Sequence, residues 1–213
     1  MAYRLIPFAF LAALLAACGP APRAGDTLPD SITARNAALR DELMRMGLLD
    51  QAVRLSFTVQ SMSDTALVRT SMVFDSILTR RLRRIVEEHG WPVRSAVGRE
   101  AAQAAFLILQ HSPSDAFQRR TLPLLEAAAQ EDEAAASDVA MLTDRLRTHD
   151  GLPQIYGTQF RIVDGVLAPF PVEQLDSLEA RRARAGLMPM AEYVKLLEQT
   201  YQGPVRWPPD SSR

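Results

Sequence analysis

The sequence contains one cysteine and one lysine in 213 residues, and its 24 basic side chains almost balance 25 acidic ones. A single cysteine excludes a disulfide scaffold, and a formal charge of −1 excludes the strongly basic character of many nucleic-acid-binding proteins. The common catalytic motifs are also missing, because no G-x-S-x-G, H-E-x-x-H or G-x-G-x-x-G pattern occurs and Lys195 lies outside any P-loop. We therefore predict no nucleic-acid partner and no cofactor.

The first 17 residues have the pattern of a secretory signal peptide, with a positive charge at Arg4, an apolar run over 5–14 and small residues after it. The run ends in Leu-Ala-Ala-Cys at 15–18, which resembles the lipobox of bacterial lipoprotein precursors. That resemblance implies a lipid on Cys18 and a membrane anchor. The alternative is an ordinary signal peptide with Cys18 as a bystander. Because Gly19, not aspartate, follows the cysteine, we expect a cell-envelope protein anchored in the outer membrane and facing the periplasm.

The mature chain divides into a tether, a domain and a tail. Residues 18–29 contain three prolines and two glycines, which favours a flexible tether. We expect a single helical domain over 30–203 and a polar tail over 204–213.

Apolar periodicity predicts a mainly α fold, a compact helical domain of about six or seven helices. The first helices cover about 31–60 and 64–89, and Phe74, Ile77, Leu78, Leu82 and Ile85 are predicted to face inward in the second. A third helix is predicted to end near His111, and a fourth is predicted to start near Ser112. Three more are predicted over about 134–149, 172–184 and 190–201. A β-hairpin near residues 158–170 is predicted from Asp164-Gly165 between two β-type runs.

Asp50 occupies an apolar position in the first predicted helix. A buried carboxylate needs a partner, and Arg54 lies one turn later on the same face. The alternative is a helix broken at Gly47, which would leave Asp50 in solvent.

His89 and His111 are each predicted at the C-terminal end of a helix, where imidazole interacts favourably with the last carbonyls. As an alternative role, either histidine could act as a general acid–base, with Asp50 or Asp144 orienting the ring. No metal site is predicted, because the histidines lack metal-binding spacing. His149 is predicted to be a surface cap.

Residues 154–159, Gln-Ile-Tyr-Gly-Thr-Gln, form the densest cluster of neutral hydrogen-bonding side chains. Such a strip can contact a polar ligand, or it can satisfy the helix ends against which the hairpin packs. Arg145 lies beside the apolar face of its helix, where its guanidinium can meet a carboxylate through two hydrogen bonds.

Several short motifs together resemble an uncharacterised bacterial family known only as a domain of unknown function. They are Asp-Gln-x-x-Arg at 50–54, His-Gly-Trp-Pro at 89–92, Gln-His at 110–111, Asp-Arg at 144–145 and Pro-Gln-x-Tyr-Gly-Thr-Gln at 153–159, and the resemblance covers about residues 35–197. It implies no activity. The motif positions supply the candidate site residues: His89, His111 and Asp144 for catalysis, and Asp50, Gln51, Arg54, Gln110, Arg145, Gln154, Tyr156 and Gln159 for ligand binding.

Two functions from different classes fit these features. The first is a cell-envelope lipoprotein of unknown molecular function that presents a polar groove, formed by the hairpin and helix ends, to a peptide, glycan or protein partner. The second is an envelope enzyme that uses His89 or His111 as general acid–base. The sequence leaves open whether the protein is an enzyme.

Overall fold

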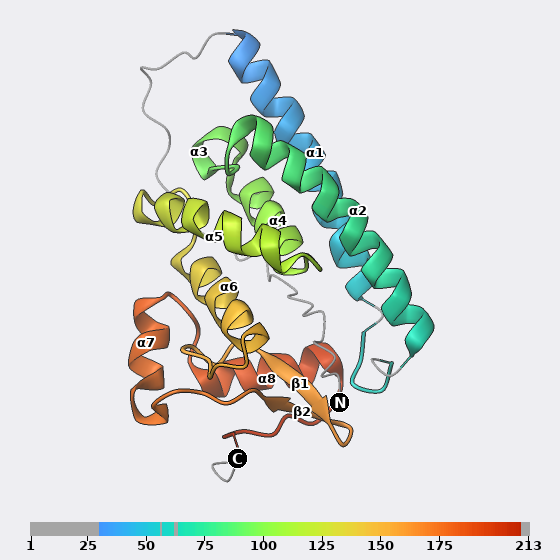
Figure 1. Cartoon of the computed structure of the whole chain (residues 1–213), viewed down its shortest axis with the longest axis vertical. Coiled ribbons are helices and arrows are strands. Elements are labelled where there is room, and N and C mark those ends of the chain that lie inside the picture. The colour runs from blue at the N-terminus through green and yellow to red at the C-terminus, as the bar shows by residue number, and fades with distance from the viewer. Residues whose placement is uncertain (1–29, 56, 62–63, 210–213) are drawn as a thin grey trace.

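The computed structural model describes residues 30–55, 57–61 and 64–209, and this part of the chain is mainly helical (Figure 1). The predicted signal peptide, Cys18 and the tether lie outside the described residues. The helices are α1 (Asp30–Arg54), α2 (Thr65–His89), α3 (Arg94–Val97), α4 (Arg99–Gln110), α5 (Asp115–Gln130), α6 (Ala136–His149), α7 (Leu178–Arg184) and α8 (Met190–Tyr201), and a 3₁₀ turn, η2 (Leu175–Ser177), precedes α7. The strands β1 (Phe160–Val163) and β2 (Val166–Pro169) form one antiparallel hairpin. The predicted fold class is confirmed.

Local sequence signals set several of these boundaries. The side chain of Asp64 accepts hydrogen bonds from the backbone N–H groups of Ala66 and Leu67 and caps the start of α2. Gly90 ends the same helix at φ +76°. The hairpin turn places Asp164 at φ 53° and Gly165 at φ 76°, as a two-residue hairpin turn requires.

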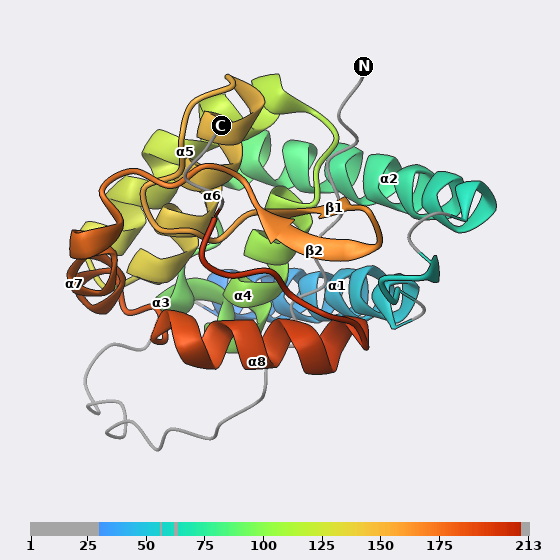
Figure 2. The same ribbon diagram turned by 90° about the horizontal axis from the view of Figure 1, so that it is seen from below.

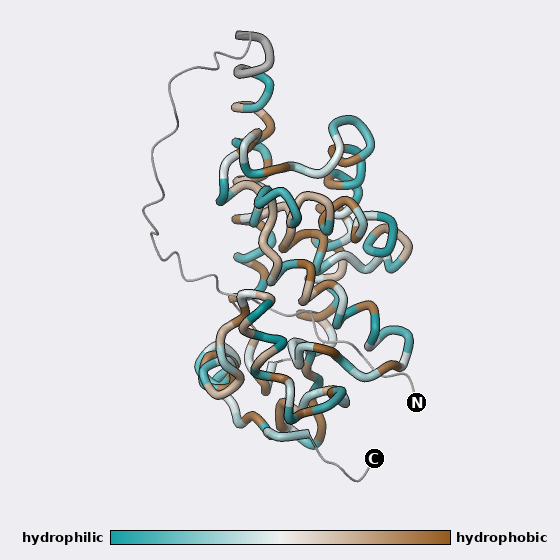
Figure 3. Tube along the Cα trace, turned by 90° about the vertical axis from the view of Figure 1, so that its left-hand side faces the viewer, coloured by the Kyte–Doolittle hydropathy of each residue, from teal (hydrophilic) through white to brown (hydrophobic). Residues whose placement is uncertain are grey.

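Two hydrophobic clusters hold the fold together. In the first, α4 is buried along almost its whole length by the surrounding helices α1, α2, α5 and α6, and the tube in Figure 3 shows apolar stretches in this central region. The second includes residues of the hairpin, α7 and α8, and Figure 2 shows α8 running alongside the hairpin. Its buried members are Phe57, Phe160, Leu167, Leu178, Met190, Tyr193, Leu197 and Tyr201. The two clusters meet near the C-terminal end of α1.

The chain after α8 packs back against the hairpin. The N–H of Leu167 donates to the Pro204 carbonyl at 3.0 Å, and the N–H of Arg206 donates to the Leu167 carbonyl at 2.7 Å. The ring of Trp207 lies 6.4 Å from that of Phe160, centroid to centroid. The first residues of the segment predicted as a polar tail therefore lie against β2.

The predicted inward face of α2 is partly wrong. Phe74 and Ile77 are exposed, and Ser71, Asp75 and Thr79 are buried instead. The apolar periodicity predicted the wrong face because half of the buried face of α2 is polar.

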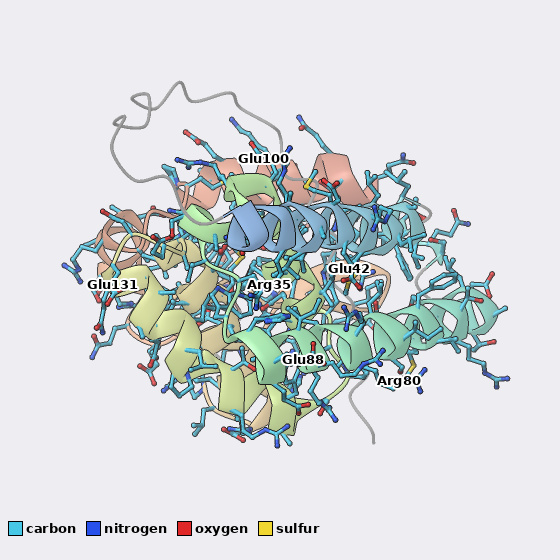
Figure 4. All side chains as sticks on the ribbon, turned by 90° about the horizontal axis from the view of Figure 1, so that it is seen from above. Arg35, Glu42, Arg80, Glu88, Glu100 and Glu131 are labelled. Carbon is cyan, nitrogen blue, oxygen red and sulfur yellow. The ribbon has the colours of Figure 1, made fainter. Side chains whose placement is uncertain are left out.

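Figure 4 shows α1 and α2 lying side by side with Glu42 between them, and Arg81 binds this carboxylate at 2.7 Å. In the described ranges, no helix combines the length and apolar character needed to cross a bilayer.

Candidate functional site

A polar centre is buried between α1, α2 and α4, and its core is an arginine shared by two aspartates. Arg54 Nη1 donates to the Asp50 carbonyl at 2.9 Å and lies 3.2 Å from Asp50 Oδ1. Arg54 Nη2 donates to Asp75 Oδ1 at 2.7 Å. Asp50 is 1% exposed and Arg54 is 2% exposed, so the predicted buried pair is confirmed. Asp75 is the partner that the sequence argument missed, because it lies on the neighbouring helix.

The alternative of a helix broken at Gly47 is wrong, since α1 runs without interruption to Arg54. Gly47 has a packing role. A Cβ at this position would lie 2.6 Å from the Cβ of Ala104, far inside van der Waals contact. The glycine therefore allows α1 and α4 to approach closely.

His111 completes the centre from the end of α4. Its Nδ1 lies 2.9 Å from Asp50 Oδ1 and 3.1 Å from Asp50 Oδ2, and Gln51 Nε2 donates to Oδ2 at 2.7 Å. Burial raises the pKa of Asp50, but His111 and Arg54 outweigh it and hold that pKa below its usual value. Burial and the charge of Arg54 lower the pKa of His111. A neutral His111 ring that donates from Nδ1 to an ionised Asp50 agrees with the lowered pKa of both groups.

Two more buried side chains, Arg145 and Gln110, have atoms without a hydrogen-bond partner in the described part of the chain. Arg145 on α6 is 5% exposed, and among the described residues its Nε and Nη2 have no hydrogen-bond acceptor. Burial, and then the charge of Arg54, lowers the pKa of Arg145 to about 10. Gln110 is 1% exposed, and neither atom of its amide group has a partner in the described chain. These unpaired atoms are unusual in a folded protein.

Asp144 organises the loop that follows α6. Its Oδ1 accepts the N–H of Ile155 at 2.7 Å and the N–H of Tyr156 at 3.1 Å. Its Oδ2 accepts the N–H of Thr158 at 3.0 Å and the hydroxyl of Thr158 at 2.9 Å. Burial raises the pKa of Asp144, and these loop bonds oppose the shift. The carboxylate predicted as a catalytic candidate is thus occupied by backbone groups.

Gln154 and Gln159 face the protein interior. Gln154 Nε2 donates to the carbonyls of Gln159 and Phe170, and its Oε1 accepts the N–H of Gln159 at 2.5 Å. Gln159 Nε2 donates to the Thr158 hydroxyl at 3.0 Å. Of the two predicted roles for this strip, these bonds correspond to internal satisfaction of polar groups.

Tyr156 alone among the predicted ligand-binding residues borders an open pocket, of about 530 Å³, between α5, α6 and α7. Its lining residues are Glu126, Ala129, Gln130, Ala136, Val139, Ala140, Tyr156, Arg181, Arg184 and Ala185. Arg182 Nη1 donates to the Tyr156 carbonyl at 2.7 Å, and Arg181 Nε donates to the Ile155 carbonyl at 2.8 Å. The arginines of α7 were missed, although the run of basic residues at 181–184 marks them in the sequence.

The other two histidines lie apart from the centre. His89 is exposed at the end of α2, about 20 Å along the helix axis from Asp75, and its nearest charged partner is Glu88 at 3.7 Å. His149 is more buried than a surface cap, since its side chain is 14% exposed and is bound to Asp115. No group of three or more His, Cys, Asp or Glu side chains in the described chain could hold a metal ion.

Comparison with protein families agrees with the resemblance expected from the motifs. The model of DUF6624, a family of unknown function, matches residues 37–206. The chain belongs to the DUF6624 family. No curated protein and no solved structure matches it. The matched part, the DUF6624 domain, contains the buried centre, the Asp144 loop and the pocket beside Tyr156.

Proposed function

We propose that this chain is a lipid-anchored protein of the cell envelope that binds a peptide, glycan or protein segment in the pocket beside Tyr156. The observation that carries the proposal is an open pocket with an aromatic residue held from two sides. Its lining includes the small side chains of Ala136, Ala140 and Ala185, which leave room for a bound chain.

The position of Tyr156 is set before any ligand arrives. Its N–H is bound by Asp144 from α6, and its carbonyl is bound by Arg182 from α7. Both of these charged side chains are buried, so the bonds are shielded from water. An aromatic residue with a fixed backbone offers contact area at a small entropic cost, which suits recognition of a sugar ring or an extended peptide.

The rims of the pocket carry opposite charges. Exposed Glu126 lies on the α5 side, and exposed Arg184 lies on the α7 side. Arg181 donates hydrogen bonds to the carbonyls of Ile155, Gln174 and Glu173, so it stabilises the backbone at the edge of the pocket. Arg184 is therefore the arginine that we expect to contact an acidic group of the ligand.

The test compares material retained from bacterial envelopes by the full-length wild type and by a Tyr156→Ala/Arg184→Glu variant. Arg80→Glu serves as the control, because Arg80 is exposed on α2, away from the pocket (Figure 4). We expect the control to retain the wild-type partner and the pocket variant to lose it, with unchanged melting temperatures. Identical partners in all three samples would overturn the pocket. Replacing Gln154 and Gln159 is a poor test, because their loss disturbs the fold.

The anchor rests on the lipobox-like residues 15–18 and is tested separately. We expect the wild-type protein to incorporate labelled fatty acid and to enter the detergent phase, whereas Cys18→Ser does neither. A wild-type protein that stays unlabelled would contradict the lipid anchor and would leave the proposed role of the pocket unaffected.

A second candidate function is catalysis with His111 as general acid–base, and the 2.9 Å contact between His111 Nδ1 and Asp50 Oδ1 favours it. Asp50 would be the positioning residue. Because both side chains are 1% exposed, the ring must become accessible during the reaction. Nitrogen NMR of the histidine rings tests this role without a known substrate. A His111 ring that neither titrates nor exchanges its protons between pH 5 and 9 would exclude it.

A further inference from the structure

We propose that Arg145, together with Arg54 and Gln110, forms a binding site for a small oxyanion, a carboxylate or phosphate group, inside the buried polar centre. This site is separate from the pocket beside Tyr156 and does not depend on the function proposed there.

Arg145 carries a buried charge without a contacting carboxylate in the described chain. Among the described residues no carboxylate forms an ion pair with it, although it is 5% exposed. The two aspartates of the centre are already engaged, since Arg54 binds both Asp50 and Asp75. Asp75 and Asp115 attract Arg145 electrostatically, but neither forms an ion pair with it in the described chain. A buried guanidinium without a contacting carboxylate is unfavourable. An anion bound beside it removes that penalty.

The unpaired atoms of these side chains are mostly hydrogen-bond donors. Arg54 Nε, Arg145 Nε, Arg145 Nη2 and Gln110 Nε2 are all N–H donors, and within the described chain none has an acceptor. Gln110 Oε1 is the one unpaired acceptor among these side chains. Four donors and one acceptor match an oxyanion with several lone pairs, and the single acceptor suits a protonated oxygen of phosphate or a water molecule.

Arg54 has one unused side and acts electrostatically on Arg145. Both Nη atoms of Arg54 point to the aspartates, which leaves its Nε edge unused. After burial, the charge of Arg54 has the largest effect on the pKa of Arg145, so the two cations repel each other. A shared anion turns this repulsion into attraction.

The experiment measures thermal unfolding of the full chain in chloride buffer and after addition of inorganic phosphate or acetate at matched ionic strength. Arg145→Gln is the test variant, and Arg80→Gln on the exposed face of α2 is the control. For the wild type and the control, we expect a saturable rise in melting temperature with one of the two anions. The anion that acts distinguishes a phosphate site from a carboxylate site.

For Arg145→Gln we expect two differences from the wild type. Removing an uncompensated buried charge should raise its melting temperature in chloride, and the saturable rise with phosphate or acetate should disappear. A Gln110→Leu variant should likewise be no less stable in chloride and should bind the anion more weakly. A wild type that responds to neither anion, a full response in Arg145→Gln, or a failure of that variant to fold in chloride would each overturn the site.

Discussion

Gly47 on α1 lies against Ala104 on α4, and a Cβ added to the glycine would stand 2.6 Å from the alanine Cβ. One turn beyond Gly47 on α1 is Asp50, and two turns beyond Ala104 is His111, whose Nδ1 lies 2.9 Å from Asp50 Oδ1. The close crossing of the two helices therefore brings Asp50 and His111 within hydrogen-bond distance.

Gly47→Ala should destabilise the protein, because the overpacked crossing costs about 1–3 kcal/mol and the gain in helix propensity of up to about 1 kcal/mol does not offset it. Adding Ala104→Gly should restore part of the loss by reopening the space. Urea unfolding of the two variants measures both effects. Wild-type stability of Gly47→Ala would show that the crossing relaxes freely.

Asp50→Ala should cost about 3–5 kcal/mol, because it leaves His111 and Gln51 without their acceptor and weakens the pairing of Arg54. Replacing Asp50 and Arg54 together by apolar residues leaves Asp75 without its arginine, so recovery should be incomplete until Asp75→Asn is added. Thermal unfolding of the single, double and triple variants measures the series.

The triple variant also separates scaffold from function. If it folds well and complements a deletion strain, the centre is structural, and if it folds well and fails to complement, the centre belongs to a functional site. An unchanged melting temperature of Asp50→Ala would contradict the buried network.

Asp138 should make stability depend on pH. Burial raises its pKa to about 7, although a hydrogen bond from Gln103 opposes the shift. Between about pH 4 and 7 the folded state keeps a proton that the unfolded state has lost, so this group's stabilising effect is present at low pH and disappears as pH rises through 7. Asp138→Asn should therefore be more stable than the wild type at pH 8, by up to about 4 kcal/mol.

Denaturant unfolding of both proteins at pH 5 and pH 8 measures the Asp138 effect. The difference between wild type and Asp138→Asn isolates this carboxyl from other titrating groups. Parallel stability curves for the two proteins would show that Asp138 titrates normally.

Asp144→Asn should loosen the loop after α6. Asparagine offers one oxygen where the loop presents several N–H groups, so buried donors lose their acceptor, at about 2–4 kcal/mol in total. Hydrogen exchange at Ile155, Tyr156 and Thr158 should become faster. Thr158→Val is the matched control, because it keeps the backbone bonds to Asp144 and removes the two bonds of the hydroxyl, one to Asp144 and one from Gln159 Nε2, at about 1–3 kcal/mol. Equal exchange rates in wild type and Asp144→Asn would contradict this role.

Much of the fold follows from local signals. The Asp164-Gly165 turn, the glycine that ends α2 and the apolar periodicity of α6 and α8 each predicted the element that is present. The position of Asp50 on an apolar stripe also predicted a buried ion pair correctly. Such signals depend on neighbouring residues only, so no knowledge of the tertiary structure is needed to use them.

The register of α2 and the roles of the polar residues required the three-dimensional structure. Phe74 and Ile77 fit an apolar helical face, but α2 turns Asp75 inward because Arg54 offers it a partner from α1. Gln154 and Gln159 looked available to a ligand, but they bind carbonyl and N–H groups of their own loop and of Phe170. A polar side chain is buried wherever a partner compensates its desolvation, and the partner need not be near in sequence.

The sequence by itself determined where most helices form and where the hairpin turns, because periodicity, caps and turn residues act over a few positions. It left the buried carboxylate in α1 as one of two alternatives. Only the tertiary structure decided which charges meet. Asp50 and His111 are 61 residues apart, and Arg145 on α6 is influenced by the charge of Arg54 on α1, because helix packing sets these distances. Long-range electrostatics depends on how the helices cross, and that crossing is a property of the whole packed core.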